Sequence, residues 1–461
     1  MTHFFLTDFL LVSDIRTIIF LLLLVAFFIY IYSIHQSTKF STCILTAALI
    51  GFMLGVAIQF ASDFQNTPKS TTFVAEVLSW YSLIGNGYMN LLHMLVIPLI
   101  IFSVINSIIN VKVELPKLIY ASLLITTIMF CVSIVVGLGI GIALDLGKDV
   151  PYYTFSPVDT PDTINIVDII SKLIPKNPIK SMMDVNIISI LIFSVFIGVC
   201  IRQTYHRHID DISPLIRLID ATHITITNMA ISLIQFMPFA IIPLFANTVA
   251  SRGISSLLDV SKFIFAMYLG VIVMFIIQMI ILKICNLSPQ TYIKKSLPTI
   301  IFAFVSRSSL CCLPSTVETL TTKLGVSTAT GTIVPSLGTS FGMQGCSGMF
   351  PALALVYVAN VNDINIDIQF LLISLVVIMI SSFGTTGLAT TGTDITNLSL
   401  AGMGIGNLTA TMTPVLLIEP IIDMGRTFIN VSGAMVNAIL VDIVVGTFDT
   451  QEFEDTKTAP I

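Results

Sequence analysis

The amino-acid sequence predicts an all-α polytopic membrane protein, and two observations carry this prediction. Of the 461 residues, 55% are hydrophobic and only 10% are charged, whereas a soluble domain carries about 25% charged residues. Apolar stretches of about 20 residues, the length that crosses a bilayer as a helix, also recur along the chain. Because the sequence has no basic patch with interleaved aromatic residues, we expect the lipid bilayer, and no nucleic acid, as a partner.

Seven apolar stretches are long enough to span the membrane. They are residues 17–34, 42–61, 81–110, 118–146, 184–201, 214–249 and 260–285. Several exceed what a straight span requires, so we expect tilts or breaks. Pro238 and Pro243 are expected to break the sixth stretch, because proline interrupts the hydrogen bonding of a helix.

The orientation of the spans follows from the lysines and arginines of short loops, which collect on the cytoplasmic side. This bias predicts an N-terminus outside the cell, with Lys39, Lys117, Arg202 and Lys283 in cytoplasmic loops. The first stretch lacks the basic start and the cleavage site of a signal peptide, so we expect it to be retained. We therefore predict a multi-pass protein of the cell (plasma) membrane with a cytoplasmic C-terminus.

The pattern changes after residue 297, where apolar runs are interrupted by glycine, serine and threonine. Residues 384–393 read Gly-Thr-Thr-Gly-Leu-Ala-Thr-Thr-Gly-Thr, and each interior glycine costs a helix up to about 1 kcal/mol relative to alanine. Such backbone survives at membrane depth only where protein buries it or water lines it. We therefore predict two re-entrant hairpins, at about 297–328 and 372–408, which flank a broken span at about 330–358. Close helix packing by small residues explains single glycines but not a run of ten residues.

A charged stripe stands out in the last apolar region. Glu419, Asp423, Arg426, Thr427 and Asn430 share one face of a helix. An aspartate or arginine at the centre of a membrane helix costs roughly 2.5–3.5 kcal/mol, so these residues need a reason to be there. One reason is a binding face for a charged solute or ion; the other is a self-satisfied Asp–Arg pair that locks two helices together. The continuation of the stripe through threonine, asparagine and a second carboxylate favours binding.

The sequence gives little support for an enzyme. No Ser/His/Asp or metal-ligand cluster stands out at helical spacing, so we expect no catalytic residues and no cofactor. The seven cysteines are odd in number and lie mostly in apolar runs, which favours buried free thiols. Cys311 and Cys312 lie in a predicted functional loop, but we do not expect them to have a redox role.

The charged stripe also carries a family resemblance. Asp423-Met-Gly-Arg426-Thr427 followed by Asn430-Val-Ser-Gly433 resembles the last membrane helix of the dicarboxylate/amino acid:cation symporters, the glutamate transporter family. Within this family, residues 418–427 and 342–351 are most similar to bacterial L-cystine uptake proteins, a branch that the extra N-terminal span also fits. Further segments agree in order, and the resemblance covers roughly residues 42–445. These segments are residues 92–99, 174–178, 307–309, 313–314 and 335–338.

The resemblance implies a homotrimer with a glutamate-transporter-like fold, two re-entrant helical hairpins and an extra N-terminal transmembrane helix. A fixed scaffold part and a mobile transport part would work as an elevator, with the hairpin at 372–408 as the outer gate. The implied parts are the extra helix (1–41), scaffold (42–110 and 184–250), transport part (118–146 and 260–445) and extracellular loop (147–183). The polar tail 446–461 reads as disordered and cytoplasmic.

The resemblance also implies residue roles. Asp423 would hold the α-ammonium group of an amino-acid substrate, and Asn430 its α-carboxylate. Arg426 would read the substrate's side chain, which for cystine means the far carboxylate. The remaining expected substrate-binding residues are Thr427, Gly345, Gly392 and, at the tip of the first hairpin, Ser308 and Ser309.

The expected coupling cation is Na⁺ or H⁺. Gln344 and Ala434 stand where the family has sodium-binding aspartates, so two sodium sites look broken. A sodium site built from backbone carbonyls near Met343 and Ser382–Thr385 could remain. Proton carriage by Glu419 or Asp394 is the rival. The alternatives are that Asp394 is a helix N-cap and that Glu419 orients Arg426.

These observations predict a secondary active transporter, a symporter that imports L-cystine by an elevator mechanism. A symporter for glutamate, aspartate or a C4-dicarboxylate is the alternative within the same class. A channel or receptor in which the Asp–Arg helix is structural is the alternative from another class.

Overall fold

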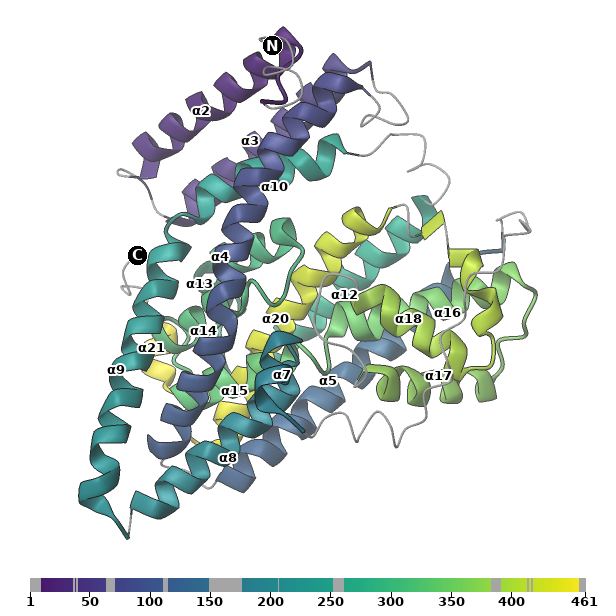
Figure 1. Ribbon diagram of the computed structural model, residues 1–461. Helices are drawn as coiled ribbons and strands as arrows, with labels where there is room; N and C mark the ends of the chain where they lie inside the picture. Colours follow the sequence, from purple (N-terminus) through teal and green to yellow (C-terminus); the bar gives the residue numbers. More distant parts are fainter. Residues whose placement is uncertain are drawn as a thin grey trace.

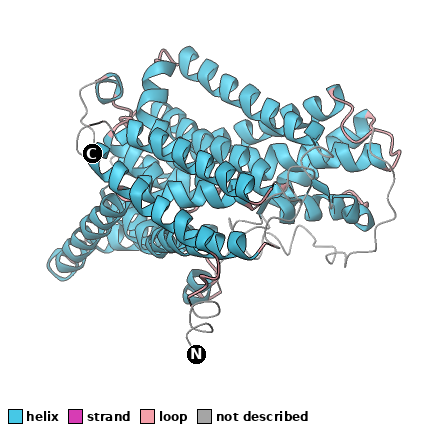
Figure 2. Ribbon diagram, turned by 90° about the horizontal axis from the view of Figure 1, so that it is seen from above, coloured by secondary structure: helices cyan, strands magenta, loops and turns pink. Residues whose placement is uncertain are grey.

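The computed structural model describes residues 10–35, 38, 40–63, 71–110, 115–148, 176–205, 207–251, 261–382, 391–412, 414–415 and 418–455. Every regular element of these residues is helical (Figures 1 and 2). The first half contains α2 (Ile15–His35), α3 (Phe40–Ala61), α4 (Thr72–Asn110), α5 (Leu115–Ala143), α7 (Pro178–Met183), α8 (Ile187–Tyr205), α9 (Ile209–Ile234) and α10 (Met237–Ala250). The second half contains α12 (Ser261–Ile284), α13 (Pro289–Ser306), α14 (Leu313–Thr322), α15 (Thr328–Gly338), α16 (Phe350–Val361), α17 (Ile368–Ser381), α18 (Thr391–Gly402), α20 (Glu419–Val445) and α21 (Thr450–Glu454).

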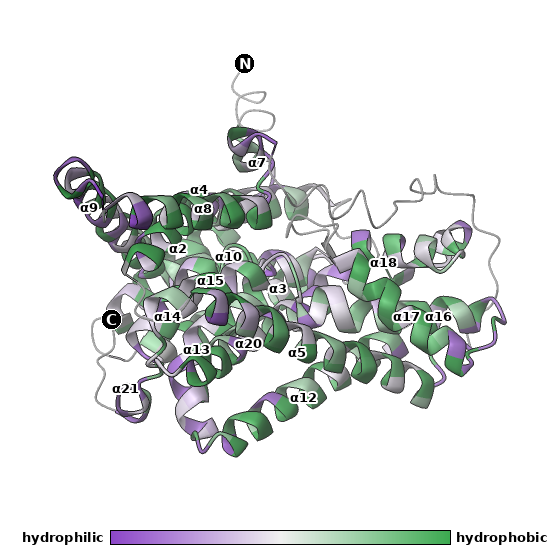
Figure 3. Cartoon of the chain, turned by 90° about the horizontal axis from the view of Figure 1, so that it is seen from below, coloured by the Kyte–Doolittle hydropathy of each residue, from purple (hydrophilic) through white to green (hydrophobic). Residues whose placement is uncertain are grey.

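The predicted polytopic architecture is confirmed. Among the described residues, seven helices are long and apolar enough to cross a membrane, and α9 with α10 form a bent pair that could make an eighth span. The bend of 55° falls directly before Pro238, which lies in the first turn of α10. Pro243 lies inside α10 and breaks nothing, so that part of the prediction is wrong. Figure 3 shows α4, α8, α12 and α17 as mainly hydrophobic, as lipid contact requires.

Two helix–turn–helix pairs lie where the sequence predicts hairpins. In the first, α13 and α14, the Thr299 hydroxyl bonds to the hydroxyls of Ser315 (2.6 Å) and Thr319 (2.9 Å) and so ties the two arms together. The second is α17 with α18, and its tip, residues 383–390, lies outside the described residues. The re-entrant course of both pairs stays a prediction.

The predicted broken span is also present. α15 ends at Gly338, and the chain resumes as a π-helical turn, Gln344–Met349, before α16. Gly342 has a φ of +76° between them, a conformation that glycine adopts without strain. π-Helical turns concentrate at functional sites, and this turn packs against α20 and α5.

The helices form two groups. α3, α4, α8, α9 and α10 pack mainly on one another. In the second group, α5, α12, α13, α15 and the π-helical turn pack on α20, and α16, α17 and α18 pack on α5, on the turn and on one another (Figure 1). The extra helix α2 joins the first group: Glu76 of α4 accepts hydrogen bonds from the Ser13 backbone (2.9 Å) and the Thr17 hydroxyl (2.6 Å). The assignment of these groups to a fixed scaffold and a moving part stays a prediction.

The C-terminal segment differs from its prediction. Residues 446–455 are folded, with Thr450–Glu454 forming α21. Phe453 is fully buried, and the Lys295 ammonium donates to the carbonyl oxygen of Glu452 at 2.6 Å. The prediction of disorder is wrong here, because one buried aromatic side chain and one lysine contact outweigh a polar composition. The rest of the tail lies outside the described residues.

The extracellular loop predicted at residues 147–183 contains one described helix, α7, which Asn177 caps. All seven cysteines are free thiols, as predicted. Cys200 is exposed on α8 rather than buried.

Candidate functional site

The charged stripe of α20 is buried in the centre of the second group of helices. Arg426 is fully buried, and Asp423, Thr427 and Asn430 are at most 7% exposed. The Glu419 side chain is 27% exposed and closes the stripe at the start of the helix. A continuous helix holds these side chains on one face, as the sequence spacing predicts.

Arg426 bridges two carboxylates. Its Nε and Nη2 donate to Asp423 Oδ1 at 3.2 and 2.9 Å, and Nη2 also donates to Glu419 Oε1 at 3.3 Å. The guanidinium carbon lies 4.2 Å above the centre of the Phe350 ring, the first residue of α16. The Asp–Arg pair that the sequence predicts is therefore real, and Glu419 contacts Arg426 as its alternative role requires.

The start of α18 closes over the guanidinium. A Cβ atom on Gly392 would lie 2.3 Å from Arg426 Nη1, so only glycine permits this approach. The neighbouring Thr393 hydroxyl donates to Glu419 Oε1 at 2.8 Å. Arg426 Nη1 is buried and has no hydrogen-bond partner among the described residues. A buried donor left unpaired is costly and rare, which marks this nitrogen as a position for a ligand.

Asn430 joins α20 to the π-helical turn and to the first hairpin. Its Oδ1 accepts the backbone N–H groups of Gly345 (2.7 Å) and Cys346 (3.1 Å). Its Nδ2 donates to Ser309 Oγ at 3.2 Å and to Cys346 Sγ at 3.0 Å. The Asn430 nitrogen is thus aimed at the tip of the first hairpin, where the sequence predicts a carboxylate of the substrate.

Not every predicted residue reaches this centre. Ser308 uses its hydroxyl to accept the Cys311 backbone N–H at 3.2 Å, within the hairpin tip. Gly345 does reach the stripe, through its N–H to Asn430 and through close packing, because a Cβ there would lie 2.3 Å from the Arg426 carbonyl oxygen. Asp394 is exposed in the first turn of α18, rather than at its N-cap. Thr385 lies outside the described residues.

Two of the residues predicted to hold a cation, Met343 and Ser382, accept hydrogen bonds from the protein itself. The Met343 carbonyl oxygen accepts two backbone N–H groups, from Ser347 at 3.0 Å and Gly348 at 3.1 Å. The Ser382 hydroxyl accepts the Gly342 N–H at 3.4 Å. A sodium ion at the Met343 carbonyl would have to displace these donors.

Gln344 belongs to a neutral hydrogen-bonded network. Gln278 of α12 donates to Gln344 Oε1 at 2.7 Å and accepts a hydrogen bond from the Ser432 hydroxyl. The Tyr292 hydroxyl then donates to the Ser432 carbonyl oxygen at 3.1 Å. Neutral amides and hydroxyls therefore surround the position where the family resemblance expects a charged sodium ligand.

Three residues of the site were not predicted from the sequence. Phe350, Thr393 and Cys346 touch the charged stripe, and Cys346 Sγ lies 3.8 Å from Asp423 Oδ1. Thr393 lies in the glycine- and threonine-rich run 384–393, and Cys346 and Phe350 lie in the segment 342–351 that carries the family resemblance, so both segments were usable signals. Their contacts with α20 depend on how distant segments pack, which spacing along the chain does not reveal.

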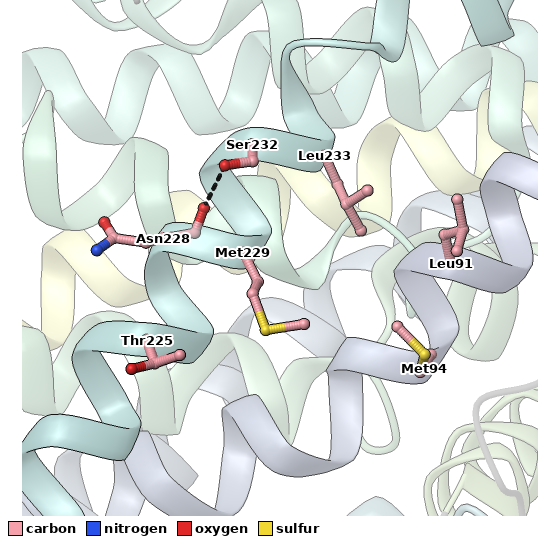
Figure 4. Close-up of a pocket in the computed structure, with 7 residues that line it drawn as sticks. All are labelled: Leu91, Met94, Thr225, Asn228, Met229, Ser232 and Leu233. Carbon is pink, nitrogen blue, oxygen red and sulfur yellow. Dashed lines mark hydrogen bonds between the residues drawn. The ribbon is translucent and has the colours of Figure 1, made fainter.

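The larger cavities lie elsewhere. A groove of about 470 Å³ between α4 and α9 is lined by Leu91, Met94, Thr225, Asn228, Met229, Ser232 and Leu233 (Figure 4). Figure 4 shows that the Ser232 hydroxyl donates a hydrogen bond to the backbone carbonyl oxygen of Asn228. Since this lining carries no charged group, the groove is no match for a zwitterion.

The sequence comparisons agree with the geometry of α20. Residues 40–444 match the model of the sodium:dicarboxylate symporter family. The chain belongs to that family. The chain is 31% identical to the L-cystine uptake protein TcyP of Bacillus cereus, over 96% of this chain and 97% of that protein. It is also 28% identical to the protein of that name from Bacillus licheniformis (91% and 93% covered) and 29% identical to that from Shouchella clausii (92% and 93%).

The family resemblance of the sequence is thereby confirmed, as is its likeness to the L-cystine uptake branch. As a member of the symporter family, the protein is a multi-pass membrane transporter, a secondary symporter for a small molecule.

Proposed function

We propose that the protein imports L-cystine as a symporter coupled to Na⁺ or H⁺. The observation that carries this proposal is the buried carboxylate–guanidinium–carboxylate cluster of Glu419, Arg426 and Asp423. Both helix–turn–helix pairs reach the charged stripe: Ser309 of the first accepts a hydrogen bond from Asn430, and Gly392 of the second lies against Arg426. The relatives named as L-cystine uptake proteins support the same substrate.

The charges of the site favour cystine over glutamate. Asp423 and Glu419 supply two negative charges, Arg426 supplies one positive charge, and Arg307 at the first hairpin tip adds a second that acts on Asp423. Cystine carries two ammonium and two carboxylate groups, so it can pair every charge. Glutamate has one ammonium group and a net negative charge, and it would leave a buried carboxylate uncompensated.

The remaining parts of the mechanism belong to the same proposal. α5, α12 to α18 and α20 would move as one body against the scaffold of a homotrimer, with the α17–α18 hairpin as the outer gate. The N-terminus would lie outside the cell and the C-terminus in the cytoplasm. The packing of α20 within the second group of helices supports this division.

The coupling cation has two candidate routes. A sodium ion could bind backbone carbonyls near Met343 and Ser382 if the N–H groups of Ser347 and Gly348 release the Met343 carbonyl oxygen. A proton could bind Glu419, which is partly exposed next to the guanidinium, or Asp394. The occupied Met343 carbonyl and the neutral Gln344 network support the proton route.

Uptake of labelled cystine into proteoliposomes tests the proposal. We expect saturable uptake under one of two imposed inward gradients, of Na⁺ or of protons, and little competition by excess glutamate or aspartate. If uptake depends on the proton gradient, the variants Glu419→Gln and Asp394→Asn should be measured next. Saturable glutamate uptake without cystine uptake would overturn the substrate, and the absence of any saturable uptake would favour a channel or receptor.

A further inference from the structure

The charged stripe of α20 contains the same pair twice. Asp423 and Asn430 are a carboxylate and a donor seven residues apart, and Glu419 and Arg426 are another such pair, four residues earlier. All four lie on one continuous helix. Four residues advance a helix by about 6 Å. The site thus offers two acceptor–donor pairs, displaced by about 6 Å along the helix axis.

This displacement fits a disulfide-linked amino-acid pair. The α-carbons of two half-cystines lie roughly 4.4–6.8 Å apart, and each carries one ammonium and one carboxylate group. We propose, on the basis of the proposed function, that Glu419 binds the second ammonium group of cystine, next to the carboxylate that Arg426 is expected to read, and so selects substrates with two amino groups.

Each of the two carboxylates has one oxygen that accepts no hydrogen bond from the described residues. Within the described part of the chain, the hydrogen bonds to Asp423 all reach Oδ1, and those to Glu419 all reach Oε1. The second oxygen of each carboxylate is thereby left for an ammonium group.

Arg426 supplies an independent observation. Its Nη1 is fully buried and has no hydrogen-bond partner among the residues that the structure describes. It lies against Gly392 at the start of α18, and a carboxylate within hydrogen-bond distance of it would satisfy it. The unsatisfied nitrogen and the partly exposed Glu419 lie at the same end of the stripe, where the second half of the substrate would reach.

The Glu419 side chain is held in one orientation by Thr393. The Thr393 hydroxyl holds Oε1 at 2.8 Å while Arg426 Nη2 contacts the same oxygen at 3.3 Å. Two donors on Oε1 fix the direction of Oε2. Because Thr393 belongs to α18, closure of this helix over the site and recognition of the second ammonium group are coupled.

Three disulfides test this inference. Besides cystine, the probes are the mixed disulfides of cysteine with 3-mercaptopropionate, which lacks the second ammonium group, and with cysteamine, which lacks the second carboxylate. Each is measured as a competitor of labelled cystine uptake in proteoliposomes. For the unsubstituted protein, we expect both mixed disulfides to compete about 10- to 100-fold less well than cystine, because each loses one charge-assisted contact.

The variant Glu419→Gln then distinguishes two roles of Glu419: direct binding of the second ammonium group, and orientation of Arg426. We expect the affinity for cystine to fall about 10- to 100-fold, while the affinity for the 3-mercaptopropionate disulfide changes less than about 3-fold. An equal loss for both compounds would overturn the inference, because Glu419 would then act only through Arg426. Unchanged cystine affinity would overturn it as well.

Two further variants serve as controls. Glu419→Asp keeps the charge with a shorter reach and should recover part of the preference for cystine. Asp211→Asn removes an exposed carboxylate on α9, outside the site, and should leave all three affinities unchanged. If the unsubstituted protein transports no cystine at all, the proposed function fails. If it transports cystine but the 3-mercaptopropionate disulfide competes equally well, only the role of Glu419 fails.

Discussion

The two ends of α20 each bury an aspartate, and the two are used differently. Asp442, near the C-terminal end, is fully buried and accepts four hydrogen bonds: from the Ser327 N–H and hydroxyl (2.8 and 2.7 Å), Thr330 (2.7 Å) and Thr447 (2.5 Å). It thereby caps the start of α15 from another helix. A carboxylate with this many donors has no capacity left for a ligand.

Among the described residues, Asp423, nearer the start, receives hydrogen bonds only from Arg426 and a distant thiol, all on one oxygen. Within the same part of the chain, its partner Arg426 has a buried nitrogen without a hydrogen-bond partner. The number of hydrogen bonds that each carboxylate accepts therefore separates structural Asp442 from Asp423, the proposed binding residue, whereas burial does not, since both are buried. Substitution of Asp423 should therefore mainly affect transport, and substitution of Asp442 should mainly affect stability.

Asp423→Asn gives the largest expected effect. The amide cannot hold an ammonium group as an anion does, so we expect cystine uptake to fall by at least about 100-fold, the loss of a charge-assisted pair in a buried site. The free energy of unfolding should change by less than about 1.5 kcal/mol, because Glu419 still pairs with the guanidinium. Proteoliposome uptake and thermal unfolding in detergent measure the two quantities. A variant that unfolds but transports normally once folded would reverse the assignment.

Asp442→Asn should show the opposite pattern. An amide replaces one carboxylate oxygen with a donor that faces hydroxyl and N–H groups, so we expect a loss of about 3 kcal/mol in the free energy of unfolding. The KM for cystine of the folded fraction should stay within about 2-fold. A KM that rose together with the loss of stability would show that this end of α20 is coupled to the site.

The same contrast shows what the sequence could predict. The spacing of Glu419, Asp423, Arg426 and Asn430 fixes their common face, because helix geometry depends only on local periodicity. The apolar spans and the two helix–turn–helix pairs were predictable from local composition. Whether an aspartate on that face is saturated depends on partners such as Ser327, which lies 115 residues away in the chain.

Individual side-chain contacts and the C-terminal fold were beyond the sequence pattern. The Phe350 ring over Arg426 and the Thr393 contact with Glu419 require the packing of α16 and α18 against α20. Phe453 lies in a largely polar tail, and no periodicity marks it as buried. Long-range packing decides these cases, and it is not encoded in local composition.

Gly392→Ala gives the smallest effect of the three and tests the free nitrogen of Arg426 directly. The added methyl group would lie 2.3 Å from Nη1, so either the guanidinium or α18 must shift. We expect the KM for cystine to rise about 10-fold, equivalent to about 1.4 kcal/mol, with a smaller change in the maximal rate. Gly139→Ala on α5 is the matched control, because a Cβ there meets nothing within 4 Å; uptake should be unaffected. If Gly392→Ala also left uptake unchanged, α18 would not lie against Arg426 when substrate binds, and the unpaired nitrogen would no longer distinguish this end of α20 from the end that holds Asp442.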